Sequence, residues 1–200
     1  MLYLFRCSAV AIIYFCFLTG PADAAEVTTT HKNLTLNGRL MTAEGKSLKD
    51  GVVLLTHGTL AHNRMELIET LQKGLKERGL TSLAISLSLG LTKRTGMYDC
   101  KVPHRHRHED ALDEIGIWLN WLKAQGAGDI VLMGHSRGGN QTAWFAAERA
   151  PSEVKRVVLL APATWNAERR VAGFKRSHKQ PLQPVLDKAK KLVAAGKGDQ

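Results

Sequence analysis

The chain has only three cysteines among its 200 residues. Cys7 and Cys16 lie in an apolar segment at the start of the chain, and only Cys100 lies beyond it. If that segment is removed, one cysteine remains and no disulfide can form within the mature chain. We expect Cys100 to be a buried or inert thiol rather than a reactive one. The remaining residues are numerous enough for one domain with a sizeable core.

The hydrophobic run near the N-terminus is also short. It covers residues 7–18, whereas a helix that crosses a membrane needs about 20 residues. Arg6 precedes the run, and the small-x-small sequence Ala22-Asp23-Ala24 follows it. We therefore predict a signal peptide over residues 1–24, cleaved after Ala24, and a secreted or periplasmic protein. An uncleaved anchor is the alternative, and no small pair typical of a lipoprotein signal precedes Cys16.

Acidic residues are few, with 18 aspartates and glutamates against 28 lysines and arginines and a net charge of +10. Much of the excess lies in residues 168–191, where Glu168 and Asp187 are the only acids. The basic residues there are Arg169, Arg170, Lys175, Arg176, Lys179, Lys188, Lys190 and Lys191. Such a segment is typical of a solvated surface, and weak contact with anionic surfaces is the alternative. No aromatic residues are interleaved as in single-strand binding, so no nucleic-acid partner is expected.

Apolar strands alternate with helical patterns along the chain, without internal repeats. The predicted strands cover residues 51–56, 80–87, 129–133 and 154–160, and the predicted helices cover residues 64–78, 109–123 and 139–149. This alternation predicts an α/β fold with a mostly parallel sheet and helices on both faces. Before the first long strand we predict a loose lead-in over residues 25–33 and a hairpin turn at Asn37-Gly38.

The most informative motif is Gly134-His135-Ser136-Arg137-Gly138, between the predicted strand 129–133 and the predicted helix 139–149. A serine at a tight strand-to-helix turn is held in a strained backbone conformation, with its hydroxyl above the sheet edge. Small residues are then needed on both sides, and Gly134 and Gly138 supply them. The amide of Arg137 comes at a helix N-terminus, where a developing oxyanion is stabilised. A plain structural turn is the alternative.

A second motif, His57-Gly58, follows the first long strand. With both motifs in this order, residues 34–163 resemble the α/β-hydrolase family. The resemblance implies a serine hydrolase of the esterase or lipase type that forms an acyl-enzyme on Ser136. It also implies a small-molecule acyl substrate and no metal or organic cofactor.

The resemblance assigns roles to residues around the serine. The oxyanion would be bound by the amides of Arg137 and Thr59, with Leu60 as the alternative to Thr59. His57 would shape the loop rather than act as the base, and His135 would pack beside the turn.

The chain departs from the family order, in which an acid and then a histidine follow the serine. His178 is the only histidine after Ser136, and Glu168 and His178 have that order. Both lie in the basic segment, where no comparable strand follows residue 160. Glu148 and Glu153 belong to the predicted helix 139–149 and the turn after it, and would face away from the strand ends. The resemblance therefore implies a fold that is incomplete at its C-terminus, with a core over residues 25–163. Residues 164–200 would form a basic helical segment, the start of a lid or cap, with a helix over 181–195. The alternative function is a non-catalytic or truncated α/β-hydrolase-like protein that lacks the acid and the histidine.

Three alternate histidines, His104, His106 and His108, invite a metal site, because imidazole is a common ligand. However, Arg105 and Arg107 lie between them and repel a cation, and no cysteine completes a ligand set. We therefore predict no metal site there, and instead a polar rim of the active-site mouth or a surface loop.

Overall fold

A computed structural model describes residues 24–198. The predicted signal peptide lies outside the described residues except for Ala24. The strands are β1 (Ala25–His31), β2 (Leu34–Met41), β3 (Val52–Thr56), β4 (Thr81–Ser86), β5 (Ile130–His135) and β6 (Val154–Leu160). The helices are a short 3-10 helix (Leu48–Asp50), α1 (Glu66–Glu77), α2 (Asp110–Ala124), α3 (Arg137–Arg149), α4 (Ala167–His178) and α5 (Gln183–Ala194). Within this part of the chain no helix is both long and apolar enough to span a membrane.

The strands form one sheet in the order β1-β2-β4-β3-β5-β6. The four strands from β4 to β6 in this order are parallel, and β1 and β2 are antiparallel. The predicted mostly parallel α/β sheet is therefore confirmed. The chain passes from β3 to β4 on one side and later places β5 on the other side of β3. Such a reversal opens a crevice at the carboxyl ends of the two central strands, here β3 and β5.

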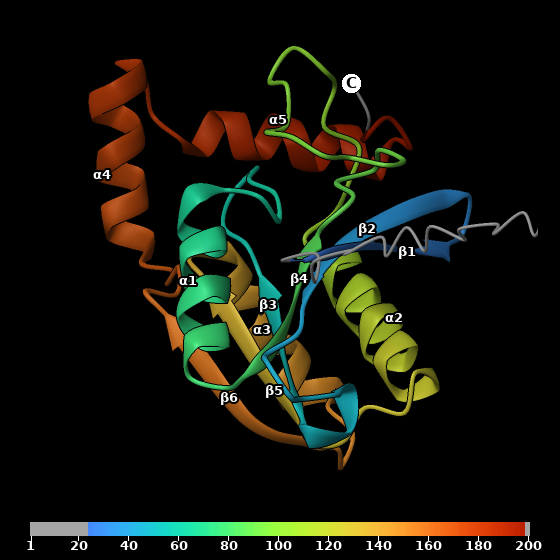
Figure 1. Cartoon of the computed structure of the whole chain (residues 1–200). Coiled ribbons are helices and arrows are strands. Elements are labelled where there is room, and N and C mark those ends of the chain that lie inside the picture. Colours follow the sequence, from blue (N-terminus) through green and yellow to red (C-terminus); the bar gives the residue numbers. More distant parts are fainter. Residues whose placement is uncertain (1–23, 199–200) are drawn as a thin grey trace, which may run out of the picture.

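Helices cover both faces of the sheet, as predicted (Figure 1). Side chains alternate between the faces along each strand. Leu55 therefore packs with Ile68 of α1 on one face, whereas Leu54 belongs to the core of α2 and α3 on the other. Trp118 of α2 is fully buried in that second core. The strands β3 and β5, which border the crevice, are thus covered by packed helices on both faces of the sheet.

Two predictions for the N-terminal part are wrong. Residues 25–31 form a strand rather than a loose lead-in, and the turn lies at Lys32 and Asn33, with Lys32 at φ 52°. Asn37 and Gly38 lie inside β2. Glycine is needed there for close packing, because a Cβ on Gly38 would come within 2.9 Å of the Trp118 ring.

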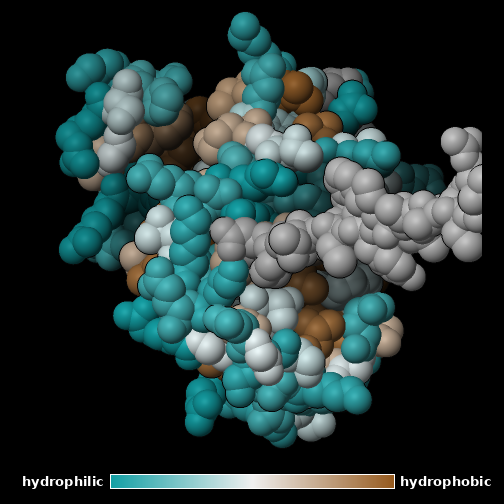
Figure 2. Space-filling view, in the orientation of Figure 1, coloured by the Kyte–Doolittle hydropathy of each residue, from teal (hydrophilic) through white to brown (hydrophobic). Residues whose placement is uncertain are grey.

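The C-terminal part packs less closely. Strand β6 pairs only with β5 among the described strands, and Val157, Val158 and Leu159 expose 41%, 38% and 43% of their surface. The predicted basic helical segment contains two helices, α4 and α5, and neither has a buried residue. They lie at the top of Figure 1, and Figure 2 shows mostly hydrophilic side chains on the outer surface of α4.

Candidate active site

Ser136 lies at the turn between β5 and α3, in a strained backbone conformation with φ 52° and ψ −119°. Its amide donates a hydrogen bond to the carbonyl of Leu160 at 3.0 Å, and its carbonyl accepts one from the amide of Ala163 at 2.7 Å. The end of β6 and the residues after it therefore hold this turn. A non-glycine residue in such a conformation costs about 1–3 kcal/mol, which the surrounding structure must offset.

The glycines around Ser136 are required by close backbone contacts. A Cβ on Gly138 would lie 2.1 Å from the carbonyl oxygen of His57, and one on Gly134 would lie 2.5 Å from that of Gly138. A Cβ on Gly58 would lie 3.2 Å from the Cβ of Ser136 and 3.1 Å from Nδ1 of His135. The loop after β3 thus lies directly against Ser136, and the His135 ring packs beside the same glycine.

His57 is fully buried and both of its ring nitrogens have partners. Nε2 accepts hydrogen bonds from the amide of Leu87 and from the guanidinium of Arg94, both at 3.0 Å. Nδ1 must therefore carry the proton, which it donates to the carbonyl of Gly58 at 2.8 Å. Burial lowers the pKa of His57 to about 3. The ring is neutral and holds the loop, and it has no free nitrogen with which to act as a base.

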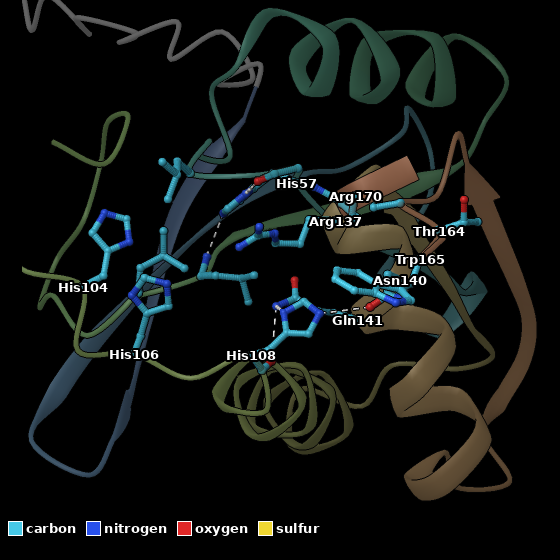
Figure 3. Close-up of a pocket in the computed structure, with 15 residues that line it drawn as sticks. His57, His104, His106, His108, Arg137, Asn140, Gln141, Thr164, Trp165 and Arg170 are labelled. Atoms are coloured by element: carbon cyan, nitrogen blue, oxygen red, sulfur yellow. Dashed lines mark hydrogen bonds between the residues drawn. The ribbon is translucent and has the colours of Figure 1, made fainter. Parts of the chain in front are cut away.

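A cavity of about 480 Å³ opens where β3 and β5 end. Its wall includes Gly58 and Arg137, which adjoin Ser136, and Leu60, whereas Ser136 and Thr59 are not part of it. Residues from the loop before α2, from α3 and from the segment before α4 complete it (Figure 3), among them His104, His106, His108, Asn140, Gln141 and Trp165. No group of three potential metal ligands occurs among residues 24–198.

The sequence profile described as alpha/beta hydrolase fold matches residues 51–180 of this chain. The chain belongs to the α/β-hydrolase family. No curated protein sequence matches it.

Several solved structures have the same fold as this chain. Est1E from Butyrivibrio proteoclasticus with bound ferulic acid has 23% identity and a TM-score of 0.58, with 75% of this chain and 56% of that chain covered. The esterase Pf2001 from Pyrococcus furiosus has 20% identity and a TM-score of 0.60, with coverage of 79% and 57%. The α/β hydrolase GrgF from Penicillium sp. sh18 has 23% identity and a TM-score of 0.60, with coverage of 86% and 54%. At these identities the likeness establishes the fold, and the chain spans little more than half the length of each protein.

A buried polar network holds His57 and the loop after β3. This network was not predicted from the sequence. Arg94 is 8% exposed and donates from Nε to the carbonyl of Leu87 at 2.7 Å, besides its bond to His57. Burial lowers the pKa of Arg94 to about 10, and nearby Glu114 favours its charged form. Glu114 accepts hydrogen bonds from the amide and hydroxyl of Ser88, and burial raises its pKa. A carboxylate among the apolar positions of helix 110–124 was the one signal that could have revealed this network.

The structure does not bring together the predicted acid and base. Glu168 and His178 lie on the same helix, α4, ten residues apart, which corresponds to about 15 Å along the axis. Both are exposed, neither lines the cavity beside Ser136, and the His178 ring packs on Phe174 with centroids 4.3 Å apart. A second groove, between α4 and α5, contains His178.

Proposed function

We propose that this protein is a serine hydrolase that cleaves an ester-like carbonyl through an acyl-enzyme on Ser136. The hydroxyl of Ser136 attacks the carbonyl carbon, the alcohol leaves, and water then releases the acid. The observation that carries the proposal is the strained turn at Ser136, held against Gly58 beside a cavity. Because a signal peptide is predicted over residues 1–24, we further propose that the protein acts outside the cytoplasm.

Backbone amides on two sides of Ser136 are suited to bind the oxyanion. Arg137 is the first residue of α3. Its amide therefore has no partner within the helix and lies at the positive end of the helix dipole. The turn after β3 supplies a second amide, from Thr59 or Leu60, and neither of these donates to another backbone carbonyl among the described residues. Removing one such donor typically lowers kcat by about 100-fold to 1000-fold.

A second candidate function is a non-catalytic α/β-hydrolase-like protein. Within residues 24–198 no imidazole forms a hydrogen bond with the Ser136 hydroxyl, although its proton must pass to a base during attack. His57 is neutral with both nitrogens engaged. The two candidates therefore differ in whether Ser136 reacts.

A fluorophosphonate probe separates the two functions. We expect the full chain to be labelled on Ser136 and to hydrolyse 4-nitrophenyl butyrate. Ser136→Ala should abolish labelling and lower turnover by about 10⁴-fold or more. Ser152→Ala, a matched change at an exposed serine remote from the turn, should be labelled like the wild type. Folded wild-type protein that the probe does not label would favour the non-catalytic candidate, and labelling that persists in Ser136→Ala would refute the assignment of the nucleophile.

A further inference from the structure

The charges that line the cavity beside Ser136 are all positive. Arg137 and Arg170 contribute guanidinium groups, and no aspartate or glutamate is part of the wall. Buried or half-buried carboxylates would otherwise be the natural partners of such groups. The cavity therefore presents two cations without a counter-charge among its lining residues.

Arg137 points into this cavity (Figure 3). Its side chain makes no hydrogen bond or ion pair with any other residue in the described range 24–198. Arg137 directly follows Ser136. A group bound by its guanidinium would therefore lie about the length of one arginine side chain from the attacked carbonyl. Arginine is suited to this task, since its planar fork binds carboxylate and phosphate oxygens with two hydrogen bonds.

Arg170, in the first turn of α4, also lines the cavity. Its guanidinium carbon lies 5.5 Å from the centroid of the Trp165 ring. This cation–π contact orients the guanidinium. In the part of the chain described, the Arg170 side chain makes no hydrogen bond or ion pair, so its N–H groups are available to a ligand.

Two carboxylates of α2, Asp110 and Glu114, have other partners. Asp110 accepts a hydrogen bond from the amide of Arg107 at 2.7 Å. Glu114 is buried beneath the loop with Ser88 and faces Arg94. Burial, with His104 and Arg137 nearby, lowers the pKa of His106, so this imidazole stays neutral at neutral pH. Among the residues that line the cavity, Arg137 and Arg170 are thus the permanently charged groups that a ligand meets.

We propose that the substrate is a small ester with a second, negatively charged group, a carboxylate or a phosphate, and that Arg137 and Arg170 bind this group. This inference rests on the proposed hydrolase function. A cavity of about 480 Å³ is in the range for small-molecule sites. The net charge of +10 would raise the association rate of such an anion by electrostatic steering.

Two esters with the same leaving group and the same six-carbon acyl chain test this inference. We expect kcat/KM to be about 10-fold higher for mono-4-nitrophenyl adipate, which is anionic, than for neutral 4-nitrophenyl hexanoate. Arg137→Gln and Arg170→Gln should each reduce the ratio of the two kcat/KM values, anionic over neutral ester, by about 10-fold. Arg176→Gln is the matched control, because it removes the same charge from an exposed position of α4 outside the cavity and should leave the ratio unchanged. Competition by adipate and by inorganic phosphate then shows which oxyanion binds better, and competition by neither contradicts the inference.

The outcomes separate this inference from the proposed function. Equal kcat/KM for the two esters would overturn the anionic substrate and leave the serine hydrolase intact. If neither ester is hydrolysed, the proposed hydrolase function is wrong. Calorimetric titration of Ser136→Ala with monomethyl adipate then tests whether the cavity binds an anion. Binding that weakens about 10-fold when Arg137→Gln is added, but not when Arg176→Gln is added, supports the anion site. Absence of binding refutes it.

Discussion

The turn at Ser136 and the segment from β6 to α5 differ in how their helices and strands are supported. The turn at Ser136 is enclosed by backbone, since the atoms nearest to a Cβ on Gly138 would be carbonyl oxygens of His57 and Thr56, and β3 and β5 carry buried core residues such as Leu54 and Leu132. In the other region β6 exposes its apolar side chains, and α4 and α5 bury no residue. Helix α5 is amphipathic in sequence, although less strongly than α1, yet of these two helices only α1 packs on the sheet. A local pattern thus forms a helix in both regions, whereas strained backbone geometry persists only where packing enforces it.

The largest expected effect comes from a methyl group added to a glycine in each region. In Gly138→Ala the added Cβ would lie 2.1 Å from the carbonyl oxygen of His57 and 2.6 Å from that of Thr56. Both contacts are with backbone, so we expect the free energy of unfolding to fall by about 4 kcal/mol or more. In Gly173→Ala of α4 the nearest atom is 4.0 Å away, and alanine favours the helix by about 0.5–1 kcal/mol. Urea unfolding of both variants measures the contrast, and equal stabilities would contradict it.

A smaller effect is expected from the titration of His57 in the buried region. Burial lowers its pKa to about 3 in the folded protein from 6.5. Between these values the unfolded chain binds a proton that the folded chain does not, so stability falls as the pH falls. The slope is about 1.4 kcal/mol per pH unit.

Urea unfolding between pH 7 and pH 4 measures this slope. His57→Asn keeps a donor for the carbonyl of Gly58 but cannot titrate. It should be less stable at pH 7 and lose this part of the pH dependence. The same slope in both proteins would show that His57 is not the group responsible.

The smallest effect is expected at the start of α4, in the exposed region. Oδ1 of Asn166 accepts a hydrogen bond from the amide of Arg169 at 2.8 Å and caps the helix. Asn166→Ala should favour local opening of α4 by about 1 kcal/mol, whereas Asn166→Asp retains the cap. Hydrogen exchange of the α4 amides measures the opening. Because α4 buries no residue, global unfolding should change by less than about 0.5 kcal/mol. An equal change in both measurements would mean that α4 unfolds together with the core.

Much of the fold follows from patterns that are local in sequence. The predicted strand at residues 129–133 and the helix after it correspond to β5 and α3, and the four predicted apolar strands form the parallel part of the sheet. Strand β1 was missed, because its threonine-rich sequence carries no apolar alternation and depends on pairing with β2. The exposure of β6 could not be predicted either. Its apolar sequence matches that of a buried strand, and only the sheet order shows that it lies at an edge.

The place of the turn at Ser136 follows from local patterns alone, because an apolar strand, the Gly-x-Ser-x-Gly motif and a helix follow one another directly in the chain. The positive net charge also follows from the sequence alone. The contacts that hold the strained conformation of the turn come from residues far away in the chain, among them His57 and Leu160. By contrast, two relations came from the tertiary structure: His57 is neutral and bonded to Arg94, and Arg137 and Arg170 share a cavity. These relations join residues far apart in the chain. Their proximity depends on sheet order and helix packing, which local sequence patterns do not encode.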